Sequence, residues 1–505
     1  MTQIIWFRRD LRLADQAALW AAVESGEAVI PVFVLDDETP KHRRMGGASR
    51  WWLHHSLTSL DADLQKLGSR LILRRGNVCD VLPALVLETG ASAVHCIRHY
   101  EPWWRNAERT LSEKINLVRH HGNYLMPMGS VKTGSGGDFK IYTPFWRALS
   151  AHMPPPKPLP NPFISSPSTA RRAGAQDKLQ PSAVVERPIG SALPRGVSTA
   201  LDTNGVGSAL VPEHWPASDT LSDWGLLPTQ PDWAGGMRDA WSPGEAGAQK
   251  RLEDFLPRAN RYDEDRNFPS IKGTSFLSPH LHFGEITPSQ CWHAACQAGG
   301  SVEVFLKELV WREYSQNVIT QFPDYGVKNA RDAFDAFLWR DVNDPNVASE
   351  LKAWQQGRTG YPIVDAGMRE LWATGWMHNR VRMIAASFLI KHLLIDWRVG
   401  EQWFWDTLVD ADYGSNATNW QWTAGTGVDS NMFVRIMAPL SQSEKFDATA
   451  YIRKWVPELV GLDAPFVHDP EEFGRKPKNY PAKIIGHREA RERALAAYAR
   501  MKLPE

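Results

Sequence analysis

Four segments in the second half of the chain place tryptophan, arginine, asparagine and carboxylates within patterns that otherwise indicate buried helices. They are GTSFLSPHL (273–281), ELVWREY (308–314), TGWMHNRVRM (374–383) and DADYGSNATNWQW (410–422). A carboxylate on a buried helix needs a partner, and Arg382 with Asp410 or Asp412 could supply a structural ion pair. Four such segments in one domain more often indicate a pocket for a large polar aromatic ligand.

The elements that would position these segments differ between the two halves of the chain. Near the N-terminus, β-branched runs alternate with helical patterns, which predicts a parallel α/β sheet flanked by helices. From Glu245 onward the pattern is helical nearly throughout, so the second domain is predicted to be all-α. The expected early elements are strands at 3–7, 29–35, 70–74 and 93–97 and a helix at 47–67.

Composition divides the chain into three parts. Residues 1–150 are predicted to form an α/β domain with a five-stranded parallel sheet, and residues 244–505 an all-α domain. Residues 151–243 are rich in Pro, Ser and Gly and are interpreted as a long surface connector, whose degree of order is left open. No GxGxxG motif follows the first strand, so a standard dinucleotide site in the α/β domain is disfavoured.

The charge and cysteine content bear on whether the protein binds a polyanion or a metal. Lys plus Arg equals Asp plus Glu at 57 each, so no polyanionic partner is demanded, although a local basic groove remains compatible with a neutral total. The CWHAAC spacing lacks a second ligand pair, so no metal is expected and the four cysteines, Cys79, Cys96, Cys291 and Cys296, are interpreted as buried thiols. The sequence has neither a secretory signal nor a membrane span, which predicts a cytoplasmic protein.

The chain resembles the DNA photolyase and cryptochrome family. The similarity runs over nearly its whole length, from WFRRDLRL through GRTGYPIVDAGMRELWATGWMHNR to EKFDATAYIRKWVPEL. Within the family it is most similar to the bacterial class I enzymes that repair cyclobutane pyrimidine dimers. The resemblance implies FAD inside the all-α domain and an antenna chromophore in the α/β domain. That antenna would be methenyltetrahydrofolate or 8-hydroxy-deazaflavin, and the sequence neither distinguishes the two nor excludes an empty site.

The resemblance also implies which residues hold FAD. A hydroxyl-rich segment would contact the pyrophosphate and ribose, where hydroxyls and backbone N–H groups at a helix start suit phosphate oxygens, although the same segment could be a simple turn and helix cap. Asn416 would face flavin N5. The implied FAD residues are Tyr262, Thr274, Ser275, Leu277, Ser278, Arg312, Trp376, Asn379, Arg382, Asp410, Asp412 and Asn416.

On the substrate side, the resemblance implies a pocket for a lesion flipped out of the duplex, as photolyases require. Trp311 and Trp422 would form the aromatic walls, because every base offers a π-face. Glu308 would hydrogen-bond the pyrimidine carbonyl. The remaining lesion and DNA contacts implied by the family are Arg266, Asn379, Arg380, Met383 and Arg435. Each arginine alone could equally be a solvated or ion-paired surface residue.

Three tryptophans match the family's chain for electron transfer to the flavin. Trp420 would be the member nearest the flavin, Trp397 the middle one and Trp339 the outer one. With 23 tryptophans in 505 residues, packing in the core is a serious alternative for any one of them.

The implied function is light-driven repair of cyclobutane pyrimidine dimers in UV-damaged DNA, by electron transfer from photoexcited reduced FAD to the lesion. The protein is expected to be a monomer with no membrane partner. One alternative is a photosensory cryptochrome, but plant-type cryptochromes carry an acidic residue in place of Asn416 and lack the pair Glu308 and Trp422. The other is a 6-4 photoproduct photolyase, which uses histidines where this chain has WMHNRVRM.

Overall fold

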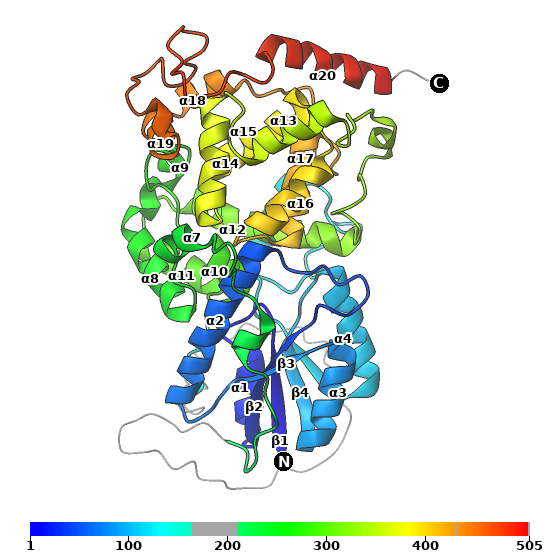
Figure 1. The fold of residues 1–505 in the computed structure, drawn as a ribbon. Coiled ribbons are helices and arrows are strands. Elements are labelled where there is room, and N and C mark those ends of the chain that lie inside the picture. The colour runs from blue at the N-terminus through cyan, green and yellow to red at the C-terminus, as the bar shows by residue number, and fades with distance from the viewer. Residues whose placement is uncertain (164–210, 431–432, 503–505) are drawn as a thin grey trace.

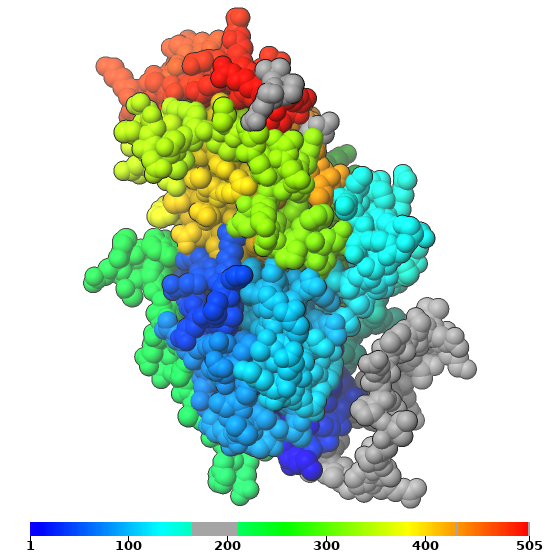
Figure 2. All heavy atoms as spheres, turned by 90° about the vertical axis from the view of Figure 1, so that its right-hand side faces the viewer, coloured from blue at the N-terminus to red at the C-terminus, as the bar shows by residue number. Residues whose placement is uncertain are grey.

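The chain forms an α/β part and a helical part that pack against each other (Figure 1). The structure is a computed structural model that describes residues 1–163, 211–430 and 433–502. From the side, the α/β residues (blue to cyan) form the lower half of the molecule beneath the helical residues (Figure 2). The predicted fold class is therefore confirmed, whereas the domain limits 1–150, 151–243 and 244–505 stay a prediction.

The α/β part is built on a five-stranded parallel sheet with strand order β3-β2-β1-β4-β5. Nearly every residue of the central strand β1 and of its neighbour β2 is buried, as expected for a sheet covered on both faces. Ile5 and Phe7 pack with α1 and α2, whereas Ile4 and Trp6 pack with α3 and α4 on the opposite face. The elements are β1 (Thr2–Phe7), α1 (Ala17–Glu24), β2 (Ala28–Leu35), α2 (Gly47–Lys66), β3 (Ile72–Arg75), α3 (Val78–Thr89), β4 (Ala91–Ile97), α4 (Pro102–Lys114), β5 (Leu117–His120) and α5 (Tyr142–Ser150).

Two details of this part differ from the sequence expectation. The third strand begins at Ile72 and not at residue 70, because the amide of Leu71 donates to the Asp61 carboxylate at 2.7 Å and so cannot pair with a strand. The fifth strand, β5, is a short edge strand with a half-buried pattern, and no long β-branched run marks it in the sequence.

The connector is more closely packed than a surface linker, in the two stretches that the structure describes. Residues 151–163 and 211–243 contain η1 (Leu221–Trp224) and α7 (Gly235–Ala240). Trp224, Met237 and Trp241 of the second stretch are buried in the same core as α2. These large apolar side chains hold this stretch against the α/β part, and the interpretation of residues 151–243 as an interdomain connector stays a prediction. Residues 164–210 lie outside the described residues.

The helical part begins at α8 and consists of short helices around one core. Its elements are α8 (Glu245–Phe255), η2 (Leu256–Arg261), α9 (Tyr262–Asp265), α10 (Ser278–Phe283), α11 (Pro288–Ala298), α12 (Glu303–Gln321), η3 (Asp332–Ala336), α13 (Pro345–Gln355), α14 (Pro362–Thr374), α15 (Asn379–Ser387), η4 (Phe388–His392), α16 (Trp397–Thr407), α17 (Tyr413–Ala424), α18 (Pro439–Lys445), α19 (Thr449–Trp455), η5 (Pro457–Leu459) and α20 (His487–Met501).

The continuous helical pattern over 361–395 is broken at Gly375. This residue has φ +68° and ends α14, and a Cβ there would lie 2.6 Å from the Met237 side chain. Only glycine adopts this left-handed conformation without strain, so the chain turns and α15 starts at Asn379. The break places Asn379, Arg380 and Met383 at the start of a new helix.

Cys79, Cys96 and Cys291 are buried, but Cys296 is exposed. Cys291 and Cys296 are five residues apart on α11 and therefore lie on different faces of that helix, so the prediction of a buried thiol is wrong for Cys296. Within the part of the chain that the structure describes, no helix is both long enough and apolar enough to cross a membrane.

Candidate active site

A cavity of about 380 Å³ lies between α12, α15 and α17. Its lining combines charged and amide side chains with aromatic ones, among them Tyr314, Tyr325 and Phe404. Eleven residues singled out from the sequence line it: Arg266, Glu308, Trp311, Asn379, Arg380, Arg382, Met383, Asp410, Asn416, Trp420 and Trp422. The structure thus brings together three of the four segments that drew attention in the sequence.

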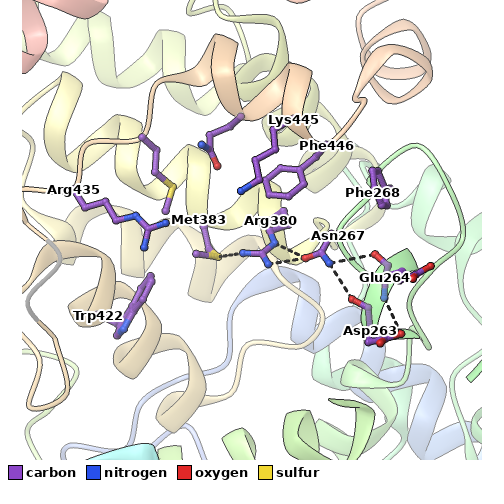
Figure 3. Close-up of a pocket in the computed structure, with 12 residues that line it drawn as sticks. Asp263, Glu264, Asn267, Phe268, Arg380, Met383, Trp422, Arg435, Lys445 and Phe446 are labelled. Carbon is purple, nitrogen blue, oxygen red and sulfur yellow. Dashed lines mark hydrogen bonds between the residues drawn. The ribbon is translucent and has the colours of Figure 1, made fainter. Parts of the chain in front are cut away.

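A surface groove of about 710 Å³ adjoins this cavity and shares Arg380, Met383 and Trp422 with it. Figure 3 shows Trp422, Met383 and Arg435 on one side of the groove and Asn267 with Asp263 on the other. Arg380 donates to the Asn267 side-chain oxygen at 3.0 and 2.6 Å, which holds its guanidinium across the groove. Arg435 and Lys445 also line the groove, so an anionic chain lying in it would pass over three cations on its way to the cavity mouth.

The start of α15 is fixed by neighbouring side chains. His378 caps the helix by accepting from the Arg380 amide at 3.3 Å, and its own amide donates to the buried Glu370 carboxyl at 3.1 Å. The Tyr451 hydroxyl donates to the same Glu370 oxygen at 2.6 Å. Burial raises the pKa of Glu370 to about 7. Asn379 and Arg382 are thereby held toward the cavity by a capped helix start that is anchored to α14 and α19.

Asp410 presents one carboxylate oxygen to the cavity. Its Oδ2 accepts from Arg382 at 2.9 Å and from the Ser278 hydroxyl at 2.6 Å. Its Oδ1 is buried and has no hydrogen-bond partner in the described structure. The Trp376 indole donates to Ser278 at 3.3 Å, so Trp376 supports this arrangement from behind. A buried carboxylate oxygen without a partner is costly, which makes Oδ1 a ready acceptor for an N–H group of a ligand.

Asp412 shapes the cavity and does not line it. Its side chain caps α17 by accepting from the Ser415 amide at 2.7 Å, and it also accepts from the Gln316 amide at 3.1 and 3.0 Å. Gly414 permits this contact, since a Cβ there would lie 2.9 Å from the Gln316 nitrogen. The capped N-terminus of α17 in turn directs Asn416 and Trp420 into the cavity.

Asn416 is held by a charged residue that the sequence analysis did not single out. Its side-chain nitrogen donates to the Glu401 backbone oxygen at 3.0 Å and to Glu401 Oε1 at 2.9 Å. Glu401 is 1 % exposed and forms two hydrogen bonds with Arg43, at 2.8 and 2.6 Å. Arg43 comes from the loop after β2, so no pattern local to the α17 segment could reveal it.

Glu308 and Arg266, which both line the cavity, form an ion pair at its wall. Trp311, one turn further along α12, stacks face to face on Tyr142 with ring centroids 3.5 Å apart. Tyr142 was not anticipated as a site residue, although it lies in an aromatic segment that starts a helix. Asp429, which also lines the cavity, accepts from the Tyr142 amide at 2.9 Å.

The three tryptophans of the expected electron-transfer chain have different surroundings. Trp420 lines the cavity, and Gly400 lets it pack against α16, because a Cβ at 400 would lie 2.1 Å from its ring. Trp397 is fully buried and donates to Asn329 at 2.9 Å. Trp339 is partly buried and packs on Phe337 at 4.3 Å. Trp354, missed in the sequence, lies beside Trp420 with ring centroids 6.5 Å apart.

Several expected flavin residues lie outside the cavity lining. The Arg312 guanidinium donates to the backbone oxygens of Asn123 and Leu281, at 2.7 and 3.2 Å, and packs over Tyr124. Ser275 and Trp376 line a separate cleft of about 820 Å³. The other residues outside the lining are Tyr262, Thr274, Leu277, Ser278 and Asp412. Two of them contact residues of the lining: Ser278 donates to Asp410, and Asp412 accepts from the Ser415 amide at the start of α17.

Comparison with known proteins identifies the family. Residues 3–162 match the family model described as DNA photolyase, and residues 305–500 match the FAD binding domain of DNA photolyase. A deoxyribodipyrimidine photo-lyase of Agrobacterium fabrum is 45% identical over 520 residues, which cover 99% of this chain and 98% of that protein. The chain belongs to the DNA photolyase and cryptochrome family. Cryptochrome-1 of Arabidopsis thaliana is 34% identical over 99% of this chain and 70% of the relative.

A solved structure refines this placement. The crystal structure of a bacterial class III photolyase from Agrobacterium tumefaciens superposes with a TM-score of 0.85 at 43% identity, covering 99% of this chain and 98% of that one. The sequence expectation of a class I enzyme is therefore not supported. The motifs that carried the resemblance run from WFRRDLRL in the α/β part to EKFDATAYIRKWVPEL in the helical part, and they identify the family and not the class.

The cofactor of this family member is FAD, and the cavity residues fit it. Two buried polar atoms of residues that line the cavity lack a hydrogen-bond partner within the described residues, Asp410 Oδ1 and Thr418 Oγ1. A heteroaromatic ring system with ring N–H and carbonyl groups and a ribityl chain of hydroxyls offers partners for such atoms. Phe404 and Trp420 supply apolar contact on the same cavity wall.

Proposed function

We propose that this protein repairs cyclobutane pyrimidine dimers in UV-damaged DNA, in a reaction driven by light. The observation that carries the proposal is one cavity lined by Asn416 and Asp410 together with Trp311, Trp422 and Glu308. When bound in the reduced state, FAD supplies an electron after it absorbs blue or near-UV light. The protein residues bind the two reactants next to each other and keep water out.

The groove supports binding of a DNA backbone. Arg380, Arg435 and Lys445 neutralise phosphates without reading sequence, which suits a lesion found in any sequence context. A dimer turned out of the duplex would enter the cavity between Trp311 and Trp422, whose rings offer apolar faces to the two bases. The cost of unstacking is lowest for a damaged step, so this pocket favours the lesion over intact DNA.

Glu308 and Arg266 would change partners when DNA binds. In the structure each neutralises the other at the cavity wall. Arg266 can turn to a phosphate in the groove, and the freed Glu308 carboxyl, in its protonated form, donates a hydrogen bond to a pyrimidine carbonyl. Such a pre-positioned group stabilises negative charge as it develops on the lesion. The ion pair thus keeps Glu308 in place until the substrate arrives.

Two other functions occur within the family. The similarity to Arabidopsis cryptochrome-1 favours a photosensory role as the second candidate, but Asn416, Glu308 and Trp422 support repair, since plant-type cryptochromes differ at these positions. A 6-4 photoproduct photolyase would use histidines in the segment WMHNRVRM, whose one histidine, His378, serves as a helix cap. From the 43% identical structure we infer class III and not class I. We also propose that the protein acts as a monomer and carries a folate or deazaflavin antenna.

The experiment that tests this function compares two lesions. Purified protein with reduced FAD is illuminated with blue light in the presence of an oligonucleotide that contains either one cyclobutane thymine dimer or one 6-4 photoproduct. We expect only the first to be restored to intact thymines, as resolved by chromatography, and only in the light. Restoration of the second would make the protein a 6-4 photolyase, and restoration of neither would favour a photosensor.

A further inference from the structure

The cleft of about 820 Å³ that Ser275 and Trp376 line lies beside the surface groove. Three segments of the chain line the groove with one part and the cleft with another: 267–272, 378–380 and 445–455. Two of these segments are joined at Ser270, whose hydroxyl donates to the Asp447 backbone oxygen at 2.6 Å and accepts from the Tyr451 amide at 3.2 Å. Residues 268–270 and 446–450 thus form a ridge between two neighbouring cavities.

The lining of the cleft carries more positive than negative side chains. Its basic residues are Arg251, Arg258, Lys272 and Lys454, and its acidic residues are Asp239, Asp254 and Glu370. Asp254 is already paired with Lys250, which lies outside the lining. Within the described residues, none of the four basic side chains of the cleft forms an ion pair with a carboxylate. Their charge is therefore available to an anion that enters the cleft.

The two arginines of the cleft are held by backbone oxygens, which fix a side chain without neutralising its charge. Arg251 donates to the Ala240 oxygen, and its guanidinium lies 4.9 Å from the centre of the Trp241 ring. Arg258 donates to the Thr274 oxygen at 3.3 Å. Side chains that are positioned in advance lose less conformational freedom when they bind a ligand. The arginines thus form a fixed positive wall.

The two lysines of the cleft are exposed and continue the basic surface of the groove. Lys272 and Lys454 lie on the cleft side of the ridge, and Arg380, Arg435 and Lys445 lie on the groove side. A row of basic side chains on one face is the electrostatic footprint of a nucleic acid. A small anion would occupy one cavity, whereas a polyanion longer than the groove would meet positive charge on both sides of the ridge.

We propose that DNA flanking the lesion leaves the groove over the ridge and continues along the cleft, where Lys272 and Lys454 bind its phosphates. This rests on the proposed function, in which the groove holds the DNA next to the lesion. The cleft lies beyond Asn267, on the side of the groove opposite Trp422 and Arg435 (Figure 3), so only one flank of the lesion reaches it. Phosphate contacts carry no sequence information, so the extra contact raises affinity and sets the direction of the DNA without restricting sequence.

The test measures how affinity depends on the length of each flank. Duplexes that contain one thymine dimer are shortened two base pairs at a time, from one end in one series and from the other end in a second series. Binding to the FAD-loaded protein is followed in the dark by fluorescence anisotropy. We expect the parental affinity to fall in a step in one series only, at the length where the flank no longer reaches the cleft.

The double variant K272Q/K454Q should lack this step. It should bind the long duplex roughly fivefold more weakly than the parent, as is typical of two exposed charge contacts, and should bind the shortened duplex as well as the parent does. The slope of log affinity against log salt concentration on the long duplex should become shallower by about 1.8, because each phosphate contact contributes about 0.9. K272R/K454R keeps both charges and should restore the parental slope.

K66Q/K328Q is the matched control, because it also removes two positive charges. Lys66 and Lys328 have side chains that are 74 % and 75 % exposed, and they line neither the groove nor the cleft. We expect the control to keep the step and the slope. A step that persists in K272Q/K454Q, or an equal loss of affinity for long and shortened duplexes, would overturn the proposal. Loss of the parental step on adding stoichiometric thymidine monophosphate would also overturn it, in favour of a pocket for a free nucleotide.

The outcome is separable from that of the repair assay. If the protein repairs no lesion but the salt slope on undamaged duplex is shallower in K272Q/K454Q than in the control, the proposed function is contradicted and this inference is retained. If the protein repairs dimers and K272Q/K454Q keeps the parental slope, only the role of the cleft is contradicted.

Discussion

The Trp311 indole and the Tyr142 phenol ring are parallel to within 3°, with centroids 3.5 Å apart. Tyr142 is itself anchored, since its hydroxyl donates to the Lys307 oxygen at 2.9 Å and its amide donates to Asp429 at the same distance. The cavity wall at Trp311 is therefore two aromatic layers thick, with one layer from α12 and the other from the start of α5.

Replacing Tyr142 tests whether the second layer supports lesion binding. Tyr142→Leu removes the stacking partner of Trp311, and an aromatic pair contributes about 0.5–1.5 kcal/mol beyond its buried area. We expect dimer-containing DNA to bind roughly tenfold more weakly, while binding of undamaged DNA changes little. Tyr142→Phe keeps the ring and should stay within about twofold of the parent. Equal lesion affinity in all three proteins, measured by fluorescence anisotropy, would show that Trp311 needs no support.

Glu308→Ala tests the carboxyl group at the lesion. Removal of one pre-organised group at a developing charge costs about 2.7–4 kcal/mol of transition-state stabilisation at an oxyanion hole. Dimer splitting competes with return of the electron to the flavin, so we expect a smaller effect here. It should appear as a lower quantum yield of repair. Glu303→Ala serves as the control, since Glu303 begins the same helix and its side chain is 68 % exposed. A Glu308→Ala quantum yield equal to that of the control would remove this residue from the chemistry.

Trp397 distinguishes core packing from electron transfer. Trp397→Phe preserves an aromatic core but loses the hydrogen bond to Asn329, so a modest loss of stability is expected. If Trp397 lies on the electron-transfer chain, the variant should photoreduce oxidised FAD more slowly yet repair dimers normally once FAD has been reduced chemically. Trp354→Phe is the informative comparison because Trp354 also lies beside Trp420. Slow photoreduction in Trp354→Phe alone would mean that the chain runs through that residue.

Stability should depend on pH through Glu370. Because burial raises its pKa to about 7, the folded protein keeps a proton there between about pH 4.5 and 7 that the unfolded chain releases. The stabilisation from this group is complete below about pH 4.5 and is lost as the pH rises through 7, by roughly 3 kcal/mol for the whole shift. Urea unfolding at pH 5 and pH 8 should therefore show a smaller difference in the free energy of unfolding for Glu370→Gln than for the parent. Glu492 has a 62 % exposed side chain on α20, so Glu492→Gln should show the same difference as the parent. If Glu370→Gln also shows the parental difference, the pH dependence does not come from Glu370.

The sequence predicted the two fold classes and eleven of the residues that line the cavity, because both depend on local patterns. Buried β-branched runs mark the sheet, and Trp, Asn and carboxylates on apolar helices mark the cavity. The turn at Gly375 was missed, because helical periodicity continues on both sides of it, whereas its φ of +68° and the close approach of Met237 and Val409 arise only in the folded chain.

The residues missed in the site are those that act across long sequence distances. Arg43 is separated from Glu401 by 358 residues, and Tyr142 and Trp311 come from different parts of the fold. A surface arginine in a loop of the α/β part carries no local signal that it will neutralise a carboxylate under α17. Contacts between residues far apart in the sequence depend on how the two parts of the molecule pack against each other. A single sequence does not predict that packing.

Light and reduced FAD together are expected to allow this protein to split a cyclobutane pyrimidine dimer. The direct measurement uses a thymine-dimer oligonucleotide mixed with protein whose FAD has been fully reduced, followed by ultraviolet absorbance of the bases during alternating dark and blue-light intervals. We expect absorbance to rise only in the light and to stop at full conversion, and the rise to vanish when undamaged DNA is substituted. No rise under illumination, with reduced FAD and bound lesion both verified in the same sample, would contradict the account.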